Sequence, residues 1–154
     1  MASGPQVGDE APDFRLDSTR SEIRLSERLA HGPVLLVFYP GDDTPVCTRQ
    51  LCDYRDNLSV FSDLGVEVIA VNSQSLASHR EFAEKHGLPF ALVSDPKRET
   101  CAAYGALGLL GMTRRALFLI GDDGRVLYRR VDLPIFRRTA EELRGVLAGL
   151  GLRA

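Results

Sequence analysis

The sequence has no excess of charge of either sign and no long hydrophobic run. It contains 19 lysine and arginine residues and 21 aspartate and glutamate residues, so the formal net charge at pH 7 is only −2. The two signs are interspersed along the chain, and it carries no basic patch of the kind that binds nucleic acid or an anionic membrane. No apolar stretch approaches the roughly 18 residues that a membrane-spanning helix needs. We therefore expect neither a nucleic acid nor a membrane among the partners of this chain.

A secretory signal and a disulfide framework are also missing. Residues 1–5 carry neither the basic nor the apolar segment of a signal peptide, which makes the cytoplasm the expected location. Three cysteines are too few to hold a small secreted fold together, so a disulfide between two of them would be transient and catalytic rather than structural. Of the 154 residues, 44% are hydrophobic and 26% are charged, which is typical of one globular domain, here residues 1–154.

Motifs of several other function classes are absent. The chain has no C-x-x-C pair, which argues against an oxidoreductase that exchanges disulfides with other proteins. The glycine-spaced segment 105–111 lacks G-x-G-x-x-G spacing and opens no helix, which argues against a nucleotide site. The three cysteines lack the close ligand pair of most structural zinc sites. We therefore expect no metal ion and no cofactor, and we expect surface or packing positions for the three histidines, which are His31, His79 and His86.

The chain does contain an alternation of short apolar runs and helical patterns. These patterns predict strands over residues 34–39, 67–72, 88–93, 115–120 and 125–131, and helices over residues 44–63, 75–87, 98–104 and 139–150. A short hairpin from residues 11–16 and 22–25 precedes them. Pro89 favours an edge strand over residues 88–93. This order indicates an α/β domain with a thioredoxin-like fold, in which helices flank a mixed central sheet and the N-terminal β-hairpin is an extension.

The stretch from residue 40 to residue 52 carries the candidate chemistry. It follows the apolar run 34–39, and Thr44 followed by Pro45 is typical of a helix start, with threonine at the N-cap and proline at the first helical position. Cys47 would then lie in the first turn, among unpaired backbone N–H groups at the positive end of the helix dipole. Such a place favours the thiolate, which is the nucleophilic form of cysteine. The alternative is that Cys47 is a small apolar residue packed in a strand-to-helix turn.

Asp42 and Asp43 oppose a thiolate at Cys47, because a carboxylate close to the sulfur repels its negative charge. The side chains of both aspartates must therefore point away, and a cation must approach the sulfur. Arg49 and Arg55 are the local candidates, and an arginine from a distant part of the chain is equally possible.

Cys52 lies five residues after Cys47. On an intact helix this spacing gives a rotation of about 140° and a rise of about 7.5 Å, which places the two Cα atoms roughly 8–9 Å apart. A disulfide needs a Cα separation below about 7 Å. Either Cys52 is structural, or the first turns of the helix unwind once Cys47 is oxidised. The third cysteine, Cys101, is expected to be a packed helix residue.

The pattern Pro40-x-x-x-Thr44-x-x-Cys47 resembles the P-x-x-x-T-x-x-C signature of the peroxiredoxins, which are thiol-dependent peroxidases on a thioredoxin fold. Gln50 and Cys52 agree with the bacterioferritin comigratory protein (peroxiredoxin Q) subfamily, whose resolving cysteine stands at the position of Cys52. The resemblance covers roughly residues 5–150. One departure is Asn-Ser-Gln at residues 72–74 in place of the usual Ser-x-Asp, which we expect to lie away from the peroxide site.

This resemblance implies a peroxidase that reduces hydrogen peroxide and organic (alkyl) hydroperoxides. Cys47 would become a sulfenic acid, and Cys52 would condense with it to an intramolecular disulfide, which thioredoxin or a glutaredoxin-like dithiol would reduce. The resemblance also implies antioxidant defence and redox homeostasis, and a monomer or weak dimer. Two alternatives stay open at this point: a thiol-disulfide oxidoreductase, and a binding module with the thioredoxin fold and incidental cysteines.

The resemblance also assigns the other site residues. Arg115 matches the active-site arginine of the family, with the adjacent Arg114 as the competing assignment. This arginine would hold the Cys47 thiolate and polarise the peroxide O–O bond. The Thr44 hydroxyl would bond to the sulfur and the peroxide, and Pro40 would shield the site from water. No histidine lies near the motif, so activation of the thiol by a general base is not expected.

Overall fold

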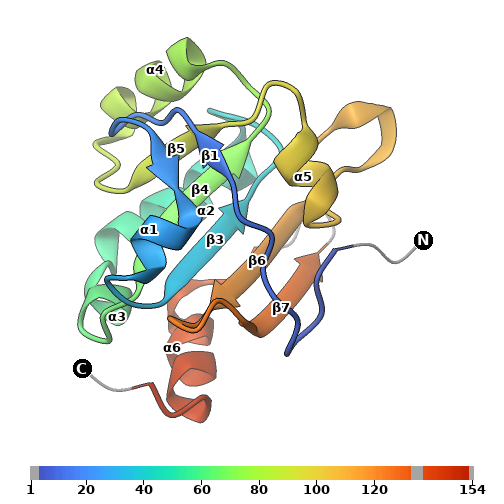
Figure 1. Cartoon of the computed structure of the whole chain (residues 1–154). Coiled ribbons are helices and arrows are strands. Elements are labelled where there is room, and N and C mark those ends of the chain that lie inside the picture. The colour runs from blue at the N-terminus through green and yellow to red at the C-terminus, as the bar shows by residue number, and fades with distance from the viewer. Residues whose placement is uncertain (1–3, 133–136, 153–154) are drawn as a thin grey trace.

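The computed structural model describes residues 4–132 and 137–152, which form a five-stranded mixed sheet with helices on both faces (Figure 1). The strand order is β5-β4-β3-β6-β7. β4 pairs in parallel with both β3 and β5, whereas β6 runs antiparallel to both β3 and β7. The mixed sheet expected from the sequence is thus confirmed. The strands are β3 Val34–Phe38, β4 Glu67–Asn72, β5 Ala91–Ser94, β6 Arg115–Ile120 and β7 Val126–Asp132.

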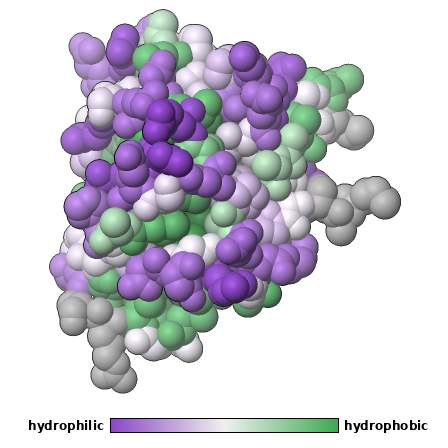
Figure 2. Space-filling view, in the orientation of Figure 1, coloured by the Kyte–Doolittle hydropathy of each residue, from purple (hydrophilic) through white to green (hydrophobic). Residues whose placement is uncertain are grey.

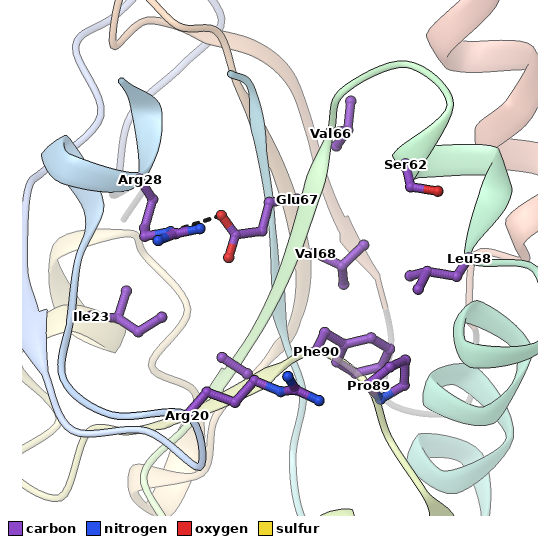
Figure 3. Close-up of a pocket in the computed structure, with 11 residues that line it drawn as sticks. Arg20, Ile23, Arg28, Leu58, Ser62, Val66, Glu67, Val68, Pro89 and Phe90 are labelled. Atoms are coloured by element: carbon purple, nitrogen blue, oxygen red, sulfur yellow. Dashed lines mark hydrogen bonds and ion pairs between the residues drawn. The ribbon is translucent and has the colours of Figure 1, made fainter. Parts of the chain in front are cut away.

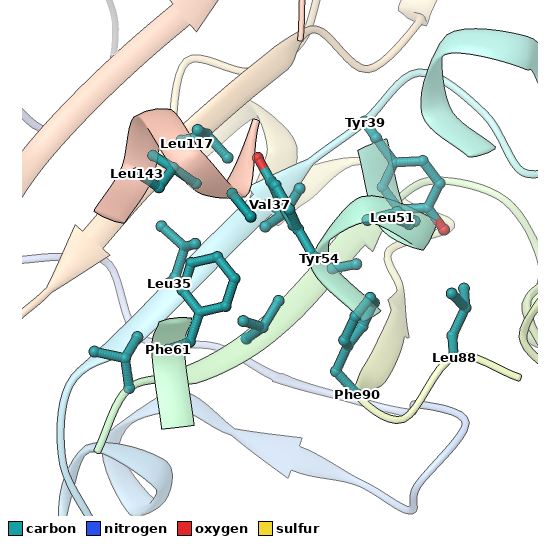
Figure 4. Close-up of a cluster of buried hydrophobic side chains, with 14 of the residues drawn as sticks. Leu35, Val37, Tyr39, Leu51, Tyr54, Phe61, Leu88, Phe90, Leu117 and Leu143 are labelled. Atoms are coloured by element: carbon teal, nitrogen blue, oxygen red, sulfur yellow. The ribbon is translucent and has the colours of Figure 1, made fainter. Parts of the chain in front are cut away.

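Helices cover the sheet from both sides, and the central strand β3 is buried along its whole length. Its side chains alternate between two hydrophobic clusters, because successive residues of a strand point to opposite faces. One cluster contains side chains of α2, α3, α4 and α6 (Figure 4), and the other contains those of the N-terminal hairpin, α1 and α5. The helices are α1 Leu25–Leu29, α2 Pro45–Asp56, α3 Ser59–Ser62, α4 Leu76–His86, α5 Glu99–Ala103 and α6 Ala140–Gly149, with a 3-10 turn η1 at Leu109–Gly111.

The N-terminal hairpin is short and protects one edge of the sheet. β1 Arg15–Leu16 pairs antiparallel with β2 Ile23–Arg24, as the sequence predicted. The segment after β1 then runs beside the edge strand β5: the Thr19 N–H donates to the Leu92 carbonyl (3.1 Å), and the Ser94 N–H donates to the Asp17 carbonyl (3.0 Å). Backbone groups of β5 that would otherwise be unpaired are satisfied in this way, which removes a template for edge-to-edge association.

The single helix predicted over residues 44–63 is wrong, because the structure has two helices there. α2 ends at Asp56, and Asn57 leaves the helical conformation with φ −121° and ψ 34°. The Asn57 side-chain amide donates to the Asp53 carbonyl (2.9 Å) and to the Asp53 carboxylate (3.0 Å). Asparagine side chains compete in this way with the backbone for helical hydrogen bonds, so the chain turns before α3 begins at Ser59.

The molecular surface seen in Figure 2 is mostly hydrophilic, with hydrophobic side chains scattered over it. Exposed large hydrophobic residues include Leu107, Leu110 and Met112, all on the loop that precedes β6. Within residues 4–132 and 137–152, no helix has the length and apolar character needed to cross a membrane.

Candidate active site

Cys47 lies at the start of α2, just beyond the end of the central strand β3. The helix begins at Pro45, and Thr44 occupies the N-cap with extended backbone angles (φ −85°, ψ 151°), as the Thr-Pro pair predicted. Cys47 is only 1% exposed and belongs to the hydrophobic cluster beneath α2. Its sulfur therefore lies in the first helical turn, where backbone N–H groups lack helical partners and favour negative charge.

The cation beside Cys47 is Arg115, which is 2% exposed. Its Nη2 donates to the Cys47 Sγ over 3.2 Å. Arg115 is the first residue of β6, and β6 pairs antiparallel with β3, so the beginning of β6 lies beside the end of β3 where the chain turns toward α2. The competing Arg114 is exposed. Of the two arginine assignments, the geometry thus favours Arg115.

The two local arginines do not supply the cation. Arg49 is exposed, and Arg55 donates to the Asp56 carboxylate (2.8 Å) and to the His86 carbonyl (2.5 Å). The arginine that reaches the sulfur is 68 residues from Cys47 in the sequence.

A chain of buried hydrogen bonds fixes the position of the Arg115 guanidinium. Its Nη1 donates to the Gln50 Oε1 (2.5 Å), the Gln50 Nε2 donates to the Tyr54 hydroxyl (3.1 Å), and the Tyr54 hydroxyl donates to the Arg138 carbonyl (2.6 Å). Burial raises the pKa of Tyr54, so this hydroxyl stays neutral and keeps its proton to donate. Our sequence analysis missed this role of Tyr54. The spacing of residues 47, 50 and 54, which places all three on one face of a helix, is the signal that could have found it.

Thr44 and Pro40 lie where the motif predicts, on the loop between β3 and α2 and at the start of α2. Pro40 is half-buried. The Thr44 hydroxyl donates to the Gly41 carbonyl (3.1 Å) and does not cap the helix. The expected hydrogen bond from Thr44 to the Cys47 sulfur is therefore not present in the described part of the chain, and the proposed contact with a peroxide stays a prediction.

Asp42 and Asp43 both turn away from the sulfur, as a thiolate at Cys47 requires. The Asp43 carboxylate accepts from Lys85 (2.8 Å) and lies 3.2 Å from the His86 Nε2, all at the surface of α4. The Asp42 carboxylate is buried and accepts from other side chains. Burial by itself raises the pKa of Asp42, but hydrogen bonds from His79, Ser78 and Tyr39 outweigh it and hold this pKa below its ordinary value.

Cys52 is a free, half-buried thiol on the same continuous helix as Cys47. It packs against the hydrophobic cluster that contains Cys47. Because α2 is regular from Pro45 to Asp56, the helical spacing that separates the two Cα atoms applies, and a disulfide between them requires the first turns of α2 to unwind.

Cys101 lies on the other side of the sheet. It belongs to the cluster with α1 and the hairpin, whereas Cys47 and Cys52 belong to the cluster beneath α2, so the sheet separates it from them. Its backbone N–H donates to the Asp95 carboxylate (2.8 Å), and burial raises the pKa of its thiol to about 12. A zinc site built from the three cysteines does not fit this arrangement.

Replacing Cys101 by serine is expected to leave the rate of peroxide consumption within about twofold of wild type. The thiol is protonated, buried and separated from Cys47 by the sheet, so it offers no nucleophile to the reaction. The initial rate of peroxide loss with a coupled dithiol reductant measures this. A defect as large as that of Cys52→Ser would instead assign a redox role to Cys101.

A pocket of about 350 Å³ lies between the N-terminal hairpin, α1, α3 and the strands β4 and β5 (Figure 3). The Arg28–Glu67 ion pair (2.9 Å) lies at one side of it, and Val68, Pro89 and Phe90 form its apolar wall. Its lining residues include none of the residues around Cys47. The candidate chemistry is therefore at the buried thiol and not in this pocket.

Comparisons with known proteins agree with the geometry. The chain matches the AhpC/TSA family over residues 7–129. It is 39% identical over 126 residues to a putative peroxiredoxin Bcp of Coxiella burnetii, a match that covers 77% of this chain and 83% of that protein. It is 33% identical over 147 residues to peroxiredoxin Bcp of Bacillus subtilis, covering 90% of this chain and 92% of that protein.

The fold is similar to that of solved peroxiredoxins. The crystal structure of peroxidoxin BcpB from Mycobacterium tuberculosis superimposes with a TM-score of 0.82 at 30% sequence identity, and the match covers 97% of this chain and 99% of that one. The thiol, the arginine and the fold around them are thus found together with a family match over most of the sequence. The chain therefore belongs to the AhpC/TSA family of peroxiredoxins.

Proposed function

We propose that this chain reduces hydrogen peroxide and organic hydroperoxides with Cys47 as the reacting thiol, and that thioredoxin or a glutaredoxin-like dithiol returns it to the reduced state. The observation that carries the proposal is the 3.2 Å contact between the Arg115 guanidinium and the Cys47 sulfur, buried at the N-terminus of α2. A cation and a helix N-terminus at one sulfur both favour the thiolate.

In the first half-reaction the Cys47 thiolate attacks one oxygen of the peroxide. The S–O bond forms while the O–O bond breaks, the sulfur is oxidised by two electrons, and the leaving oxygen takes up a proton to become water or an alcohol. Negative charge moves from the sulfur to the leaving oxygen, so donors that are already oriented there lower the barrier. Arg115 is such a donor, because Gln50 holds its guanidinium in place. Thr44 and Pro40 are proposed to complete the peroxide site.

In the second half-reaction the Cys52 thiol condenses with the sulfenic acid of Cys47. The S–S bond forms, the S–O bond breaks, and water leaves. The regular helix between the two cysteines must unwind for this step, which makes the oxidised form locally unfolded around α2. An external dithiol then reduces the disulfide by thiol exchange, and the exposed, unwound segment gives it access to the sulfur.

The test is peroxide consumption by the wild-type protein with thioredoxin, thioredoxin reductase and NADPH, and in parallel with glutaredoxin, glutathione, glutathione reductase and NADPH. We expect NADPH oxidation that depends on both the peroxide and this chain in at least one of the two systems. Hydrogen peroxide and cumene hydroperoxide, compared at equal concentration, rank the substrates. If no dithiol supports peroxide loss, the peroxidase proposal fails and a binding module takes its place.

Replacing Cys52 by serine is expected to stop multiple turnover with thioredoxin while leaving the first peroxide step intact. Without a resolving thiol the sulfenic acid of Cys47 persists, and dimedone labelling followed by mass spectrometry detects it. With peroxide added at no more than one equivalent per chain, the reduced variant should convert it stoichiometrically to the sulfenic acid and then stop. The Cys101→Ser variant is the matched control. Turnover of Cys52→Ser at the wild-type rate would show that the intramolecular disulfide is not required.

A further inference from the structure

A second buried polar cluster adjoins the Cys47 site, and it is centred on Asp42. The Asp42 carboxylate, 4% exposed, accepts from the Tyr39 hydroxyl (2.5 Å), the Ser78 hydroxyl (2.6 Å) and the His79 Nδ1 (2.7 Å). Tyr39 directly follows β3, whereas Ser78 and His79 lie in α4. The loop that precedes Cys47 is thus tied by one side chain to two different elements.

The contact with His79 is a buried hydrogen bond. The His79 ring is fully buried, and its Nε2 lies 3.0 Å from the Val93 carbonyl while its Nδ1 faces the Asp42 carboxylate. A carbonyl and a carboxylate both accept hydrogen bonds, so each ring nitrogen of His79 faces an acceptor. Removing the carboxylate leaves a buried polar group without its partner, which is destabilising. The loop is therefore held firmly at Asp42.

The backbone of Asp42 is held as well. Its N–H donates to the Gln74 Oε1 (2.5 Å), which also accepts from the Asn72 Nδ2 (3.1 Å). The Asn72 Oδ1 in turn accepts from the Gln74 N–H (2.9 Å). Gln74 thus contacts the loop that leads to Cys47, although it does not belong to the peroxide site itself. We call this set of residues the Asp42 clamp: Tyr39, Asp42, Asn72, Gln74, Ser78 and His79.

The Asp42 clamp adjoins the loop before α2, a helix whose N-cap side chain makes no capping hydrogen bond. The helices α4 and α6 are capped by the side chains of Ser75 and Thr139, whereas the Thr44 side chain makes no capping bond to α2. The N-cap bond contributes about 1 kcal/mol in other helices. The first turn of α2 therefore lacks this stabilisation, and the buried, hydrogen-bonded Asp42 carboxylate lies two residues before Thr44.

We propose that the Asp42 clamp positions Cys47 against Arg115 for the peroxide step and fixes the point from which α2 unwinds for the Cys52 step. Asp42, His79 and Gln74 are positioning residues, because they act through the loop and do not touch the reacting atoms. The inference rests on the proposed peroxidase function. It adds that the buried contacts of Asp42 with Ser78 and His79 of α4, and with Gln74 after β4, set the balance between the folded and unwound forms of the active site.

The balance between the folded and unwound forms determines which of two reactions the Cys47 sulfenic acid undergoes. In the unwound form it condenses with Cys52 and releases water. In the folded form it attacks a second peroxide, so that the sulfur is oxidised by two more electrons to a sulfinic acid while the peroxide is reduced to water or an alcohol. A loosened clamp therefore slows the first peroxide step and overoxidation together, while disulfide formation keeps its rate or becomes faster.

The experiment compares Asp42→Ala, Asp42→Asn and Gln74→Ala with Asp43→Asn. Asp43 is the matched control, because it is the neighbouring aspartate and its ion pair with Lys85 of α4 is exposed, where such a pair contributes little. Its φ of +59° is a conformation that asparagine tolerates well. Competition with a haem peroxidase for limiting hydrogen peroxide gives the rate constant of the first step. Rapid acid quench and mass spectrometry give the rate of disulfide formation, and a peroxide titration during turnover gives the fraction overoxidised per cycle.

We expect Asp42→Ala to lower the first rate constant about tenfold or more, because misplacing a reacting group by about 1 Å can cost a factor of a hundred. Disulfide formation should be no slower than in wild type, and fewer chains should be overoxidised per cycle. Asp42→Asn should restore part of the first rate constant, since its amide oxygen can still accept. Gln74→Ala, at a half-buried position, should change the same quantities in the same directions by about threefold.

Two results would contradict the proposed role of the Asp42 clamp. One is that Asp42→Asn and Gln74→Ala match Asp43→Asn in all three measurements. The other is that the first peroxide step and disulfide formation slow by the same factor. That would happen if the substitution only lowered the fraction of protein that is folded. If Asp42→Ala does not fold, the comparison of the other two variants decides. A wild-type protein that consumes no peroxide would contradict the proposed function itself, which separates the two failures.

Discussion

The Cys47→Ser variant is expected to lose peroxide reduction, by at least about a thousandfold. A serine hydroxyl is not ionised at neutral pH and cannot form a sulfenic acid, so neither Arg115 nor the helix N-terminus has a thiolate to stabilise. Because Cys47 is buried and the replacement is nearly isosteric, the fold should persist. The measurement is the rate constant of the first peroxide step, together with a test for the Cys47–Cys52 disulfide after peroxide treatment.

The Cys101→Ser variant is the control for this loss, because it removes another buried cysteine from the opposite face of the sheet. Circular dichroism and thermal unfolding of both variants show whether either substitution disturbs the fold. If Cys47→Ser still reduced peroxide at a tenth of the wild-type rate, the assignment of Cys47 as the reacting thiol would be wrong, and Cys52 would be the next candidate.

The Arg115→Met variant is expected to lower the rate constant of the first step by about 10²–10³, which is the usual effect of removing one oriented donor from a transition state. Methionine fills much of the volume of the buried arginine stem but supplies neither charge nor hydrogen bonds. The Gln50 Oε1 then loses its partner, which should also lower the free energy of unfolding by about 1–3 kcal/mol. The rate constant and a denaturant unfolding curve measure the two effects separately.

Two further variants sharpen this prediction. Arg114→Met is the matched control, because Arg114 is adjacent in sequence and exposed, so its loss should leave the rate constant unchanged. Arg115→Lys keeps the charge but cannot donate to Gln50 and to the sulfur with a planar fork, so we expect activity between those of wild type and Arg115→Met. Equal effects of Arg114→Met and Arg115→Met would contradict the assignment of Arg115.

The sequence by itself determined the local features of this protein. Strand and helix periods and the Thr-Pro helix start depend on residues that are close in sequence, so their spacing predicted them. The same holds for the place of Cys47 in the first turn of α2, since a cap and a proline decide where a helix begins. The end of α2 was not predicted correctly, because the Asn57 side chain competes with the backbone for the last helical hydrogen bonds.

Only the tertiary structure decided which distant residues meet. Residue spacing alone left Arg49, Arg55 and a distant arginine open as the cation, and only the resemblance to the peroxiredoxins named Arg115, with Arg114 as its competitor. The choice of Arg115, 68 residues away, depends on the antiparallel register of β6 against β3. The pairing of Asp42 with His79, 37 residues away, likewise depends on how α4 packs beside the loop after β3. Contacts of this kind follow from strand order and helix packing, which no local pattern encodes, and here they place the Arg115 guanidinium beside the reacting thiol.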